Sequence, residues 1–269
     1  MRSLTCRSLV PGGLLAALVV AAASSADQIG TYDASLGLLP GDICWTAVGA
    51  NQAPPPTFVD GALKHGQTSY GTSSYFSRAL PPYLFADGAA VTAVVKIQSS
   101  TWYASNPFKR TGYYVNLADK SGKFAALGIA SDRILLQTLD QNWSDQTYLM
   151  DTTNAFHTYR LAFSGSTVAV FVDGRQVLSD TVGSGATPNQ VIFGDVSILG
   201  ASTSLTKSIV VEGLPDCVVA DLDCDGDVDG SDLGVLLGAW GTDACEADLN
   251  KDGTVDGIDL GTMLGLWGA

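Results

Sequence analysis

Two acidic segments near the C-terminus carry oxygen-bearing side chains at alternate positions. They span residues 221–232 and 248–259, and 14 of the 21 positions that start at Asp221 and at Asp248 are identical. Calcium takes six to eight oxygen ligands, and a 12-residue loop supplies them from positions 1, 3, 5, 7, 9 and 12. Both segments have this length and this spacing of oxygen donors. We therefore predict two calcium sites, one in each loop.

The two loops offer nearly the same ligands, with a backbone carbonyl at position 7 and a water-mediated contact at position 9. In the first loop the predicted ligands are Asp221, Asp223, Asp225, Asp227, Asp229 and Asp232. In the second they are Asp248, Asn250, Asp252, Thr254, Asp256 and Asp259. Gly226 and Gly253 occupy position 6, where the loop must turn sharply. Because the carboxylates repel one another without a cation, we expect metal binding to be coupled to folding.

An apolar repeat follows each loop and argues against the alternative of a disordered acidic tail. The apolar residues recur at i, i+3, i+4 and i+7, the spacing of one face of an α-helix. They are Leu233, Leu236, Leu237 and Trp240 after the first loop, and Leu260, Met263, Leu264 and Trp267 after the second. Gly241 and Gly268 suit the helix ends, and Val228 and Val255 are expected to pair as a short strand between the loops. Each loop is thus predicted to lead into one amphipathic helix.

An EF-hand would also need a helix before each loop, and neither approach segment predicts one. Pro215 would break a helix ahead of the first loop, and residues 242–247 are too few for more than a turn. The repeated loop-then-helix unit, with Asp at position 12, resembles a type I dockerin over about residues 217–269. The resemblance implies two calcium ions, a small all-α fold and docking onto a cohesin-like module.

The sequence departs from the dockerin family where that family recognises its partner. Recognition relies there on loop positions 10 and 11 and on basic residues along the helix. Here those loop positions are Gly230-Ser231 and Gly257-Ile258, and the helices carry four glycines and no Lys or Arg. A Gly-x-x-x-Gly face would allow close helix packing.

Residues 1–26 have the pattern of a secretory signal peptide. A basic start precedes an apolar run from Leu9 to Ala23, and small residues precede Asp27. The alternative is an uncleaved anchor, but the apolar run is short for a membrane span. We expect a secreted or cell-surface protein, with one domain over residues 27–213, a linker at 214–216 and the repeat at 217–269.

The negative charge is concentrated in the repeat. The chain has a formal net charge of −13, and residues 217–269 contain 12 acidic residues against one basic residue, Lys251. The acidity therefore reports the expected calcium ligands. It argues against nucleic acid or an anionic membrane as a partner.

Four cysteines remain after the signal peptide and permit disulfide bonds in a secreted protein. They are Cys44, Cys217, Cys224 and Cys245. Because Cys217 and Cys245 precede the two loops by similar distances, we favour a Cys217–Cys245 bond. Cys224 would then be free or paired with Cys44 across the domains. No Cys-x-x-Cys motif or Cys/His cluster suggests zinc.

Alternating apolar residues dominate the larger domain and predict strands. The expected strands cover residues 88–99, 113–117, 124–129, 134–139, 156–163, 167–172, 175–178 and 191–195. In the first, Val91, Ala93, Val95 and Ile97 should share one face. Asp173-Gly174 between two alternating runs predicts a type I′ hairpin. Many short strands and no long helix predict an all-β jelly-roll sandwich.

The same strands carry a resemblance to a second family. Residues 156–160, the Val-Phe-Val-Asp-Gly at 170–174 and residues 191–195 resemble the laminin-G-like, concanavalin A-like jelly roll over about residues 30–212. That family includes lectins, carbohydrate-binding modules, laminin-type adhesion modules and glycoside hydrolases. The resemblance also implies a structural calcium in the sandwich, whose ligands we do not place.

Catalytic residues are not assigned. Glycosidases of this fold usually carry Glu-x-Asp-x-x-Glu on a strand, whereas the larger domain has a single glutamate, Glu212. His65 and His157 lie far apart in the sequence, and His157 reads as a structural strand residue. No Gly-x-Ser-x-Gly motif appears. A polysaccharide-degrading glycoside hydrolase with Asp catalysts is kept as an alternative.

Sugar sites on such sandwiches stack pyranose rings on exposed aromatic side chains. The candidates for carbohydrate binding are Trp102, Tyr103, Arg110, Tyr114 and Trp143, and the alternative for each is packing at the core edge. We expect a secreted protein whose sandwich binds a polysaccharide or surface glycan and whose repeat docks it to a cohesin-like partner. The second alternative is an adhesion protein with the repeat as a calcium-stabilised stalk.

Overall fold

The structure is a computed structural model. It describes residues 31–49, 54–67, 69, 71–80, 89–102, 111–119, 121–138, 146–183, 186–212, 220–223, 225–250 and 252–268. The expected signal peptide (1–26), the linker (214–216), Cys217 and Cys224 lie outside these residues. Within them, every helix is too short or too polar to cross a bilayer.

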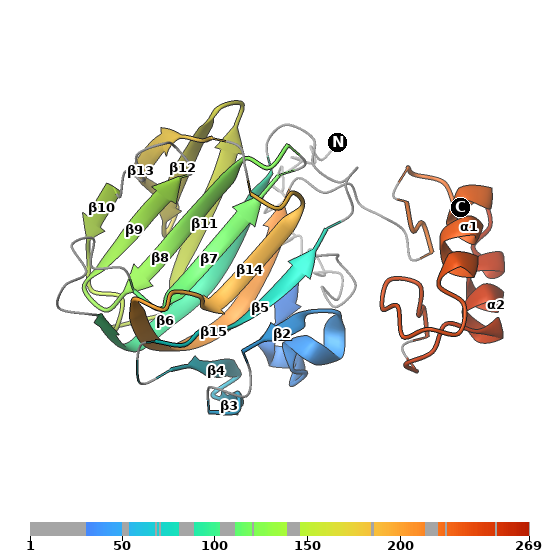
Figure 1. Cartoon of the computed structure of the whole chain (residues 1–269), viewed down its shortest axis with the longest axis horizontal. Helices are drawn as coiled ribbons and strands as arrows, with labels where there is room; N and C mark the ends of the chain where they lie inside the picture. The colour runs from blue at the N-terminus through green and yellow to red at the C-terminus, as the bar shows by residue number, and fades with distance from the viewer. Residues whose placement is uncertain are drawn as a thin grey trace, which may run out of the picture.

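Two antiparallel sheets pack face to face and form a β-sandwich (Figure 1). Sheet A contains β1 (Tyr32–Asp33), β3 (Thr57–Val59), β4 (Ala62–Gly66), β6 (Ala90–Trp102), β11 (His157–Ser164), β12 (Thr167–Val172), β13 (Arg175–Thr181) and β15 (Gly200–Glu212). Sheet B contains β2 (Thr46–Val48), β5 (Ser74–Ala79), β7 (Tyr113–Ala118), β8 (Phe124–Ala130), β9 (Arg133–Thr138), β10 (Gln146–Leu149) and β14 (Gln190–Asp195). The predicted all-β sandwich is confirmed.

The strand order gives each sheet its neighbours. Sheet A runs β13-β12-β11-β6-β15-β4-β3 with β1 beside β15, and sheet B runs β10-β9-β8-β7-β14-β5-β2. Two short 3₁₀ helices, η2 (Ala34–Leu36) and η3 (Pro40–Ile43), precede β2. The long central strands β6 and β15 pair along most of their length and form the middle of sheet A.

The inward faces of both sheets form the core, as the alternation predicts. Val91, Ala93, Val95 and Ile97 of β6 are all buried and belong to one hydrophobic cluster. The β12–β13 turn has positive φ at Asp173 and Gly174, 49° and 82°. Type I′ turns need positive φ at both central residues, so the predicted hairpin is confirmed.

Strand β15 is absent from the sequence prediction although it is one of the two longest strands. The inward side of its first half is polar, because Ser202, Ser204 and Thr206 are buried there between the sheets, whereas Ile209 and Val211 of its second half belong to the core. Apolar alternation therefore does not mark the first half of the strand. Its position comes from pairing with β6, β4 and β1.

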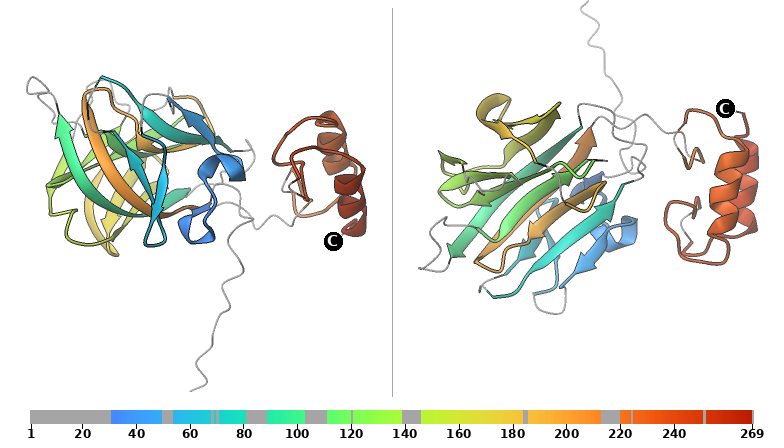
Figure 2. Two further views of the ribbon diagram at one scale, coloured as in Figure 1. Left: turned by 90° about the horizontal axis from the view of Figure 1, so that it is seen from below. Right: turned by 45° about the horizontal axis from the view of Figure 1, so that its top comes forward.

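The C-terminal repeat has a small core of its own. Helices α1 (Gly230–Gly238) and α2 (Gly257–Gly265) each follow one acidic loop. The core is formed by Ala220, Val228, Leu236, Ala247, Val255 and Met263. Figures 1 and 2 show both helices on the side of the repeat that points away from the sandwich, with the loops on the nearer side.

Candidate functional site

The first acidic loop brings three carboxylates together. Asp221, Asp223 and Asp225 each offer an oxygen, and these oxygens lie within 4.8 Å of one another. The two oxygens of Asp221 also accept hydrogen bonds from the backbone N–H groups of Asp225 (3.2 Å) and Gly226 (3.1 Å). Gly226 has a φ of 103°, which permits the sharp turn predicted at position 6. The loop is thus folded around its own carboxylates.

Asp232 closes the first loop. Its Oδ1 accepts hydrogen bonds from the backbone N–H groups of Leu222 (2.6 Å) and Asp223 (3.0 Å), and its Oδ2 accepts one from Asp229 (2.8 Å). The Asp229 side chain in turn accepts from the backbone N–H groups of Ser231 and Asp232 at the start of α1. This reciprocal pattern is a capping box. The buried Asp232 therefore joins the beginning of the loop to the helix that follows it.

The second loop repeats this geometry. Asp248 accepts from the backbone N–H groups of Asp252 (3.2 Å) and Gly253 (2.8 Å). Asp259 accepts from those of Asn250 (3.1 Å) and Asp256 (2.7 Å). Gly253 has a φ of 93°, close to that of its counterpart. The same hydrogen bonds therefore form in both copies, although a third of the aligned residues differ.

The donor set fits a hard cation. Every predicted ligand lies in its loop, and the donors are carboxylate, amide and carbonyl oxygens, which calcium prefers. Burial, followed by repulsion from Asp232 and Asp225, raises the pKa of Asp223. A cation would relieve this repulsion. Among the described residues, Asp221, Asp223 and Asp225 form the one group of three acidic, His or Cys side chains within ligand reach, so the expected sandwich calcium remains unplaced.

The buried valines of the two loops do not pair as predicted. The carbonyl of Val228 accepts a hydrogen bond from Gly268 N–H (2.9 Å), and that of Val255 accepts one from Gly241 N–H (2.8 Å). Each loop is thus closed by the end of the other repeat. Gly241 and Gly268 lie beyond the last helical residues, with left-handed φ values of 74° and 77°.

The predicted helix faces are only half buried. Leu236 and Met263 are fully buried, but Leu237 is 50% exposed and Leu264 is 53% exposed. The two tryptophans, Trp240 (46%) and Trp267 (47%), are also largely exposed. The helical glycines face open space and do not pack between the helices. The predicted helices are present after both loops, but spacing alone does not show which side of a small helix pair is covered.

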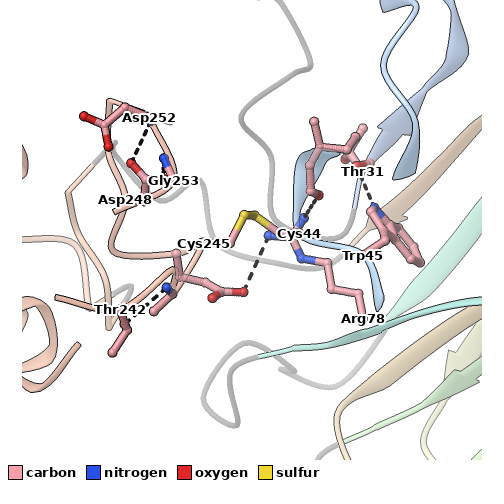
Figure 3. The surroundings of a disulfide bond; sticks show 12 residues. Thr31, Cys44, Trp45, Arg78, Thr242, Cys245, Asp248, Asp252 and Gly253 are labelled. Carbon is pink, nitrogen blue, oxygen red and sulfur yellow. Dashed lines mark hydrogen bonds and ion pairs between the residues drawn. A yellow bond between two sulfur atoms is a disulfide. The ribbon is translucent and has the colours of Figure 1, made fainter. Parts of the chain in front are cut away.

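A disulfide joins the sandwich to the repeat (Figure 3). It links Cys44, the residue that caps η3, to Cys245, and their Cα atoms lie 5.5 Å apart. The predicted Cys217–Cys245 bond is therefore wrong. The two cysteines are separated by 201 positions in the sequence, and only the folded sandwich brings η3 close to Cys245.

A buried arginine lies beside the disulfide. Arg78 of β5 donates a hydrogen bond through Nη1 to the carbonyl of Ile43 (3.3 Å), next to Cys44. Its Nη2 lies 3.9 Å from a carboxylate oxygen of Glu246, next to Cys245. One covalent and one ionic contact thus attach the repeat at adjacent residues.

Most of the predicted glycan contacts lie outside the described residues. This applies to Tyr103, Arg110 and Trp143, and to the side chain of Trp102, the last residue of β6. Tyr114 in β7 is only 3% exposed, so it is not the exposed stacking surface that was predicted. Its ring lies over Gly128, where an added Cβ would approach Cε1 to 2.8 Å.

Tyr114 shares the outer face of sheet B with two polar residues that the sequence analysis missed. Asn116 and Gln137 lie in one row across β7, β8 and β9, each paired in register with Ala126. Both are more than nine-tenths buried, and Asn116 Oδ1 has no hydrogen-bond partner among the described residues. The alternation of Val115, Asn116 and Leu117 was the available signal for this polar face.

The candidate acids and bases are occupied by structural contacts. Arg160 donates to Glu212 Oε2 through Nε (2.9 Å) and Nη2 (2.8 Å), and these bonds lower the pKa of Glu212. His157 hydrogen-bonds Asp173 (2.7 Å) and Asn154 (2.9 Å). These contacts fit the structural role expected of His157, and a general acid would need a raised pKa.

One carboxyl group with a raised pKa was not predicted. Asp195 at the end of β14 is fully buried, and burial raises its pKa to about 7. Its Oδ2 accepts hydrogen bonds from the backbone N–H groups of Ser202 (2.9 Å) and Gln67 (3.3 Å), both on sheet A or at its edge. Gly112 packs against this carboxyl so closely that any Cβ would overlap it. Asp195 therefore joins the two sheets.

No family model matches the sequence, and no curated protein matches it. Similar solved structures include a carbohydrate esterase of Shiga toxin-encoding bacteriophage phi24B, at 14% identity over 67% of this chain and 95% of the other, with a TM-score of 0.49. Mouse laminin alpha1 domains LG4-5 match at 18% identity over 59% of this chain and 44% of the other, with a TM-score of 0.42. An endo-beta-1,3-glucanase from Pyrococcus furiosus matches at 11% identity over 58% and 76%, with a TM-score of 0.41. At these scores the likeness bears on no site residue.

Proposed function

We propose that the repeat is a calcium-dependent docking module of the type I dockerin kind, carried by a secreted glycan-binding β-sandwich. The repetition of the same carboxylate-to-backbone hydrogen bonds in both loops carries this proposal. Asp232 and Asp259 close their loops with equivalent bonds. Two copies of one geometry favour a shared ligand over an incidental acidic cluster.

In each loop the chain supplies the oxygen donors and calcium supplies positive charge when bound. Asp221 and Asp248 place the first carboxylate of each loop, and their bonds to the following backbone hold the turn. Asp232 and Asp259 fix the opposite side. Because the donors repel one another without a cation, ion binding should stabilise the folded repeat.

The helices present the surface that we propose for docking. Val235, Leu237 and Trp240 of the first copy are exposed, as are Ile258, Leu264 and Trp267 of the second. Large exposed apolar residues gathered on a small module are typical of protein interaction sites. Since these helices carry no Lys or Arg, the partner should present an apolar surface and not an acidic one. A cohesin-like module of this kind is the proposed partner.

The proposed glycan contact is Asn116 on the outer face of sheet B, a buried polar group and not an exposed stacking surface. Buried polar groups normally find hydrogen-bond partners, so the unpartnered Asn116 Oδ1 favours a polar ligand at this face. The ion pair with Arg160 engages Glu212, the one glutamate of the larger domain. Asp195, whose pKa is raised, is fully buried and bonded between the two sheets, which disfavours it as the acid of a hydrolase. The sandwich is therefore proposed as a binding module.

Two binding assays on the mature chain, residues 27–269, test the proposal. The first is retention on a panel of polysaccharides, with analysis of released sugars. Retention without release is expected, and Asn116→Ala should weaken it severalfold while the control Thr158→Ala, on the other sheet, leaves it unchanged. Released oligosaccharide would favour the hydrolase, and the absence of both would favour a structural adhesion protein.

The second assay is capture by a panel of cohesin-like modules with calcium or with EGTA. We expect the chain to be captured in the presence of calcium and not in the presence of EGTA. Leu237→Asp with Leu264→Asp should abolish capture while calcium binding persists. Calcium binding without capture by any module would leave the repeat as a calcium-stabilised stalk.

A further inference from the structure

The disulfide enters the repeat beside only one of the two loops. Cys245 and Glu246 lie three and two residues before Asp248, the first ligand position of the second loop. The aligned positions before the first loop, 27 residues earlier, are Val218 and Val219. These residues offer neither a thiol nor a charge. The attachment to the sandwich therefore breaks the symmetry of the repeat.

The segment between Cys245 and Asp248 is a tight turn. The backbone N–H groups of Ala247 and Asp248 both donate to the carbonyl of Ala244, each at 3.0 Å. Ala247 is buried in the core of the repeat, and Asp248 is buried as well. A constraint on the position of Cys245 therefore also restricts the position of Asp248.

The other end of the disulfide is held firmly. Cys44 follows η3, whose Ile43 carbonyl is bonded to Arg78, and Arg78 lies in β5 of sheet B. Arg78 also approaches Glu246 across the same contact, with Nη2 3.9 Å from the carboxylate. The disulfide therefore ties the segment before the second loop to η3, which Arg78 joins to β5.

We propose that the Cys44–Cys245 disulfide is a redox lock on the second calcium site. The inference rests on the proposed calcium binding of that loop. The bond removes ion-free arrangements in which Asp248 lies away from Asn250 and Asp252. Less ordering is then needed when the ion binds, which raises affinity. Because coupling between two events is reciprocal, calcium in this loop must also make the disulfide harder to reduce.

The redox step is a thiol–disulfide exchange with a small-molecule couple such as glutathione. Two glutathione thiols reduce the protein bond, and the products are the Cys44 and Cys245 thiols and one glutathione disulfide. Two electrons and two protons pass from glutathione to the protein. In the reverse direction glutathione disulfide is the oxidant.

The test isolates each loop in the full mature chain. Asp232→Ala leaves the second loop as the intact site, and Asp259→Ala leaves the first. Calcium affinity is then measured calorimetrically in each background, with the disulfide intact and with Cys44→Ser and Cys245→Ser together. The serine pair should weaken the second loop about tenfold, within the usual range of coupling between sites. It should leave the first loop within about twofold.

A second measurement reads the reciprocal effect and does not depend on serine variants. The wild-type chain is equilibrated in glutathione buffers with calcium or with EGTA, and the thiols are trapped and located by mass spectrometry. Calcium should shift the Cys44–Cys245 equilibrium by the same tenfold factor, about 30 mV. Cys217→Ser is the control and should leave this shift unchanged.

The outcomes separate this inference from the calcium proposal. Calcium binding to both loops with equal affinities in the oxidised and serine forms would overturn the lock and leave the docking module standing. Absence of calcium binding in the oxidised wild-type chain would overturn both. A mapped Cys217–Cys245 bond, in place of Cys44–Cys245, would also overturn the lock.

Discussion

The backbone N–H of Gly268 donates a 2.9 Å hydrogen bond to the carbonyl of Val228 and so ties the end of the second repeat to the first loop. Gly241 makes the equivalent bond to Val255 in the opposite direction. The two valines lie in the same small core. Neither loop–helix unit is therefore complete alone, and the repeat should fold as one cooperative unit.

Chelation of calcium should unfold the repeat and leave the sandwich folded. The core of the repeat is separate from that of the sandwich, and its loops concentrate repelling carboxylates. With EGTA, hydrogen exchange should show loss of amide protection over residues 220–268, while β6 and β15 keep theirs. Loss of protection in both domains together would contradict the separation of the two cores.

Each loop-closing aspartate should be needed for one calcium site. Asp232→Ala removes the acceptor of three backbone N–H groups in the first loop. Asp259→Ala removes the acceptor of the equivalent N–H groups of Asn250 and Asp256 in the second. Calorimetry should count two sites in the wild-type chain and one in each variant. Asp243→Ala, an exposed aspartate between the loops, is the matched control and should retain two. Two sites in either loop variant would refute the loop assignment.

The sequence predicted the parts of this protein that local pattern determines. The alternation of Val91 to Ile97 marked β6, and Asp173-Gly174 marked a hairpin because two positive φ angles favour these residues. The acidic loops were recognisable because their hydrogen bonds close within 12 residues. In each case the cause and its effect lie close together in the chain.

The features that the sequence did not predict depend on distant neighbours. Ser202 and Thr206 lie in a strand that local alternation does not mark, and both are buried against Tyr113 of sheet B. Leu237 belongs to the apolar face that the spacing predicts. The spacing does not show that the other helix covers a different side of α1. The Cys44–Cys245 pairing follows from the fold of the whole sandwich, so counting cysteines left it open.

Two neighbouring leucines test the corrected face of α1. Leu236→Ala should destabilise the calcium-loaded repeat by about 2–4 kcal/mol, because it removes fully buried methyl groups. Leu237→Ala should change its stability by less than about 0.5 kcal/mol, since that side chain is half exposed. Urea unfolding followed by the helical circular dichroism signal measures both. Similar losses in the two variants would mean that Leu237 is covered in solution.

The stability of the sandwich should depend on pH through Asp195. Burial raises the pKa of this carboxyl from 3.8 to about 7, so the unfolded chain loses its proton at a lower pH than the folded chain does. The contribution is fully present below pH 4 and is lost as pH rises to about 7. The loss is at most about 4 kcal/mol, since one pKa unit corresponds to about 1.4 kcal/mol.

His65 acts in the opposite direction and must be separated from Asp195. Burial lowers the pKa of His65 from 6.5 to about 4, so the unfolded chain gains a proton first and stability falls as pH drops from 6.5 to 4. Asp195→Asn removes one titration and leaves the other. Urea unfolding of the sandwich in calcium, between pH 4 and pH 7, measures both effects. The free energy of unfolding of Asp195→Asn should rise with pH. The free energy of unfolding of the wild type minus that of the variant should fall with pH. A difference that does not change with pH would show that Asp195 titrates near its ordinary value and that its burial is relieved in solution.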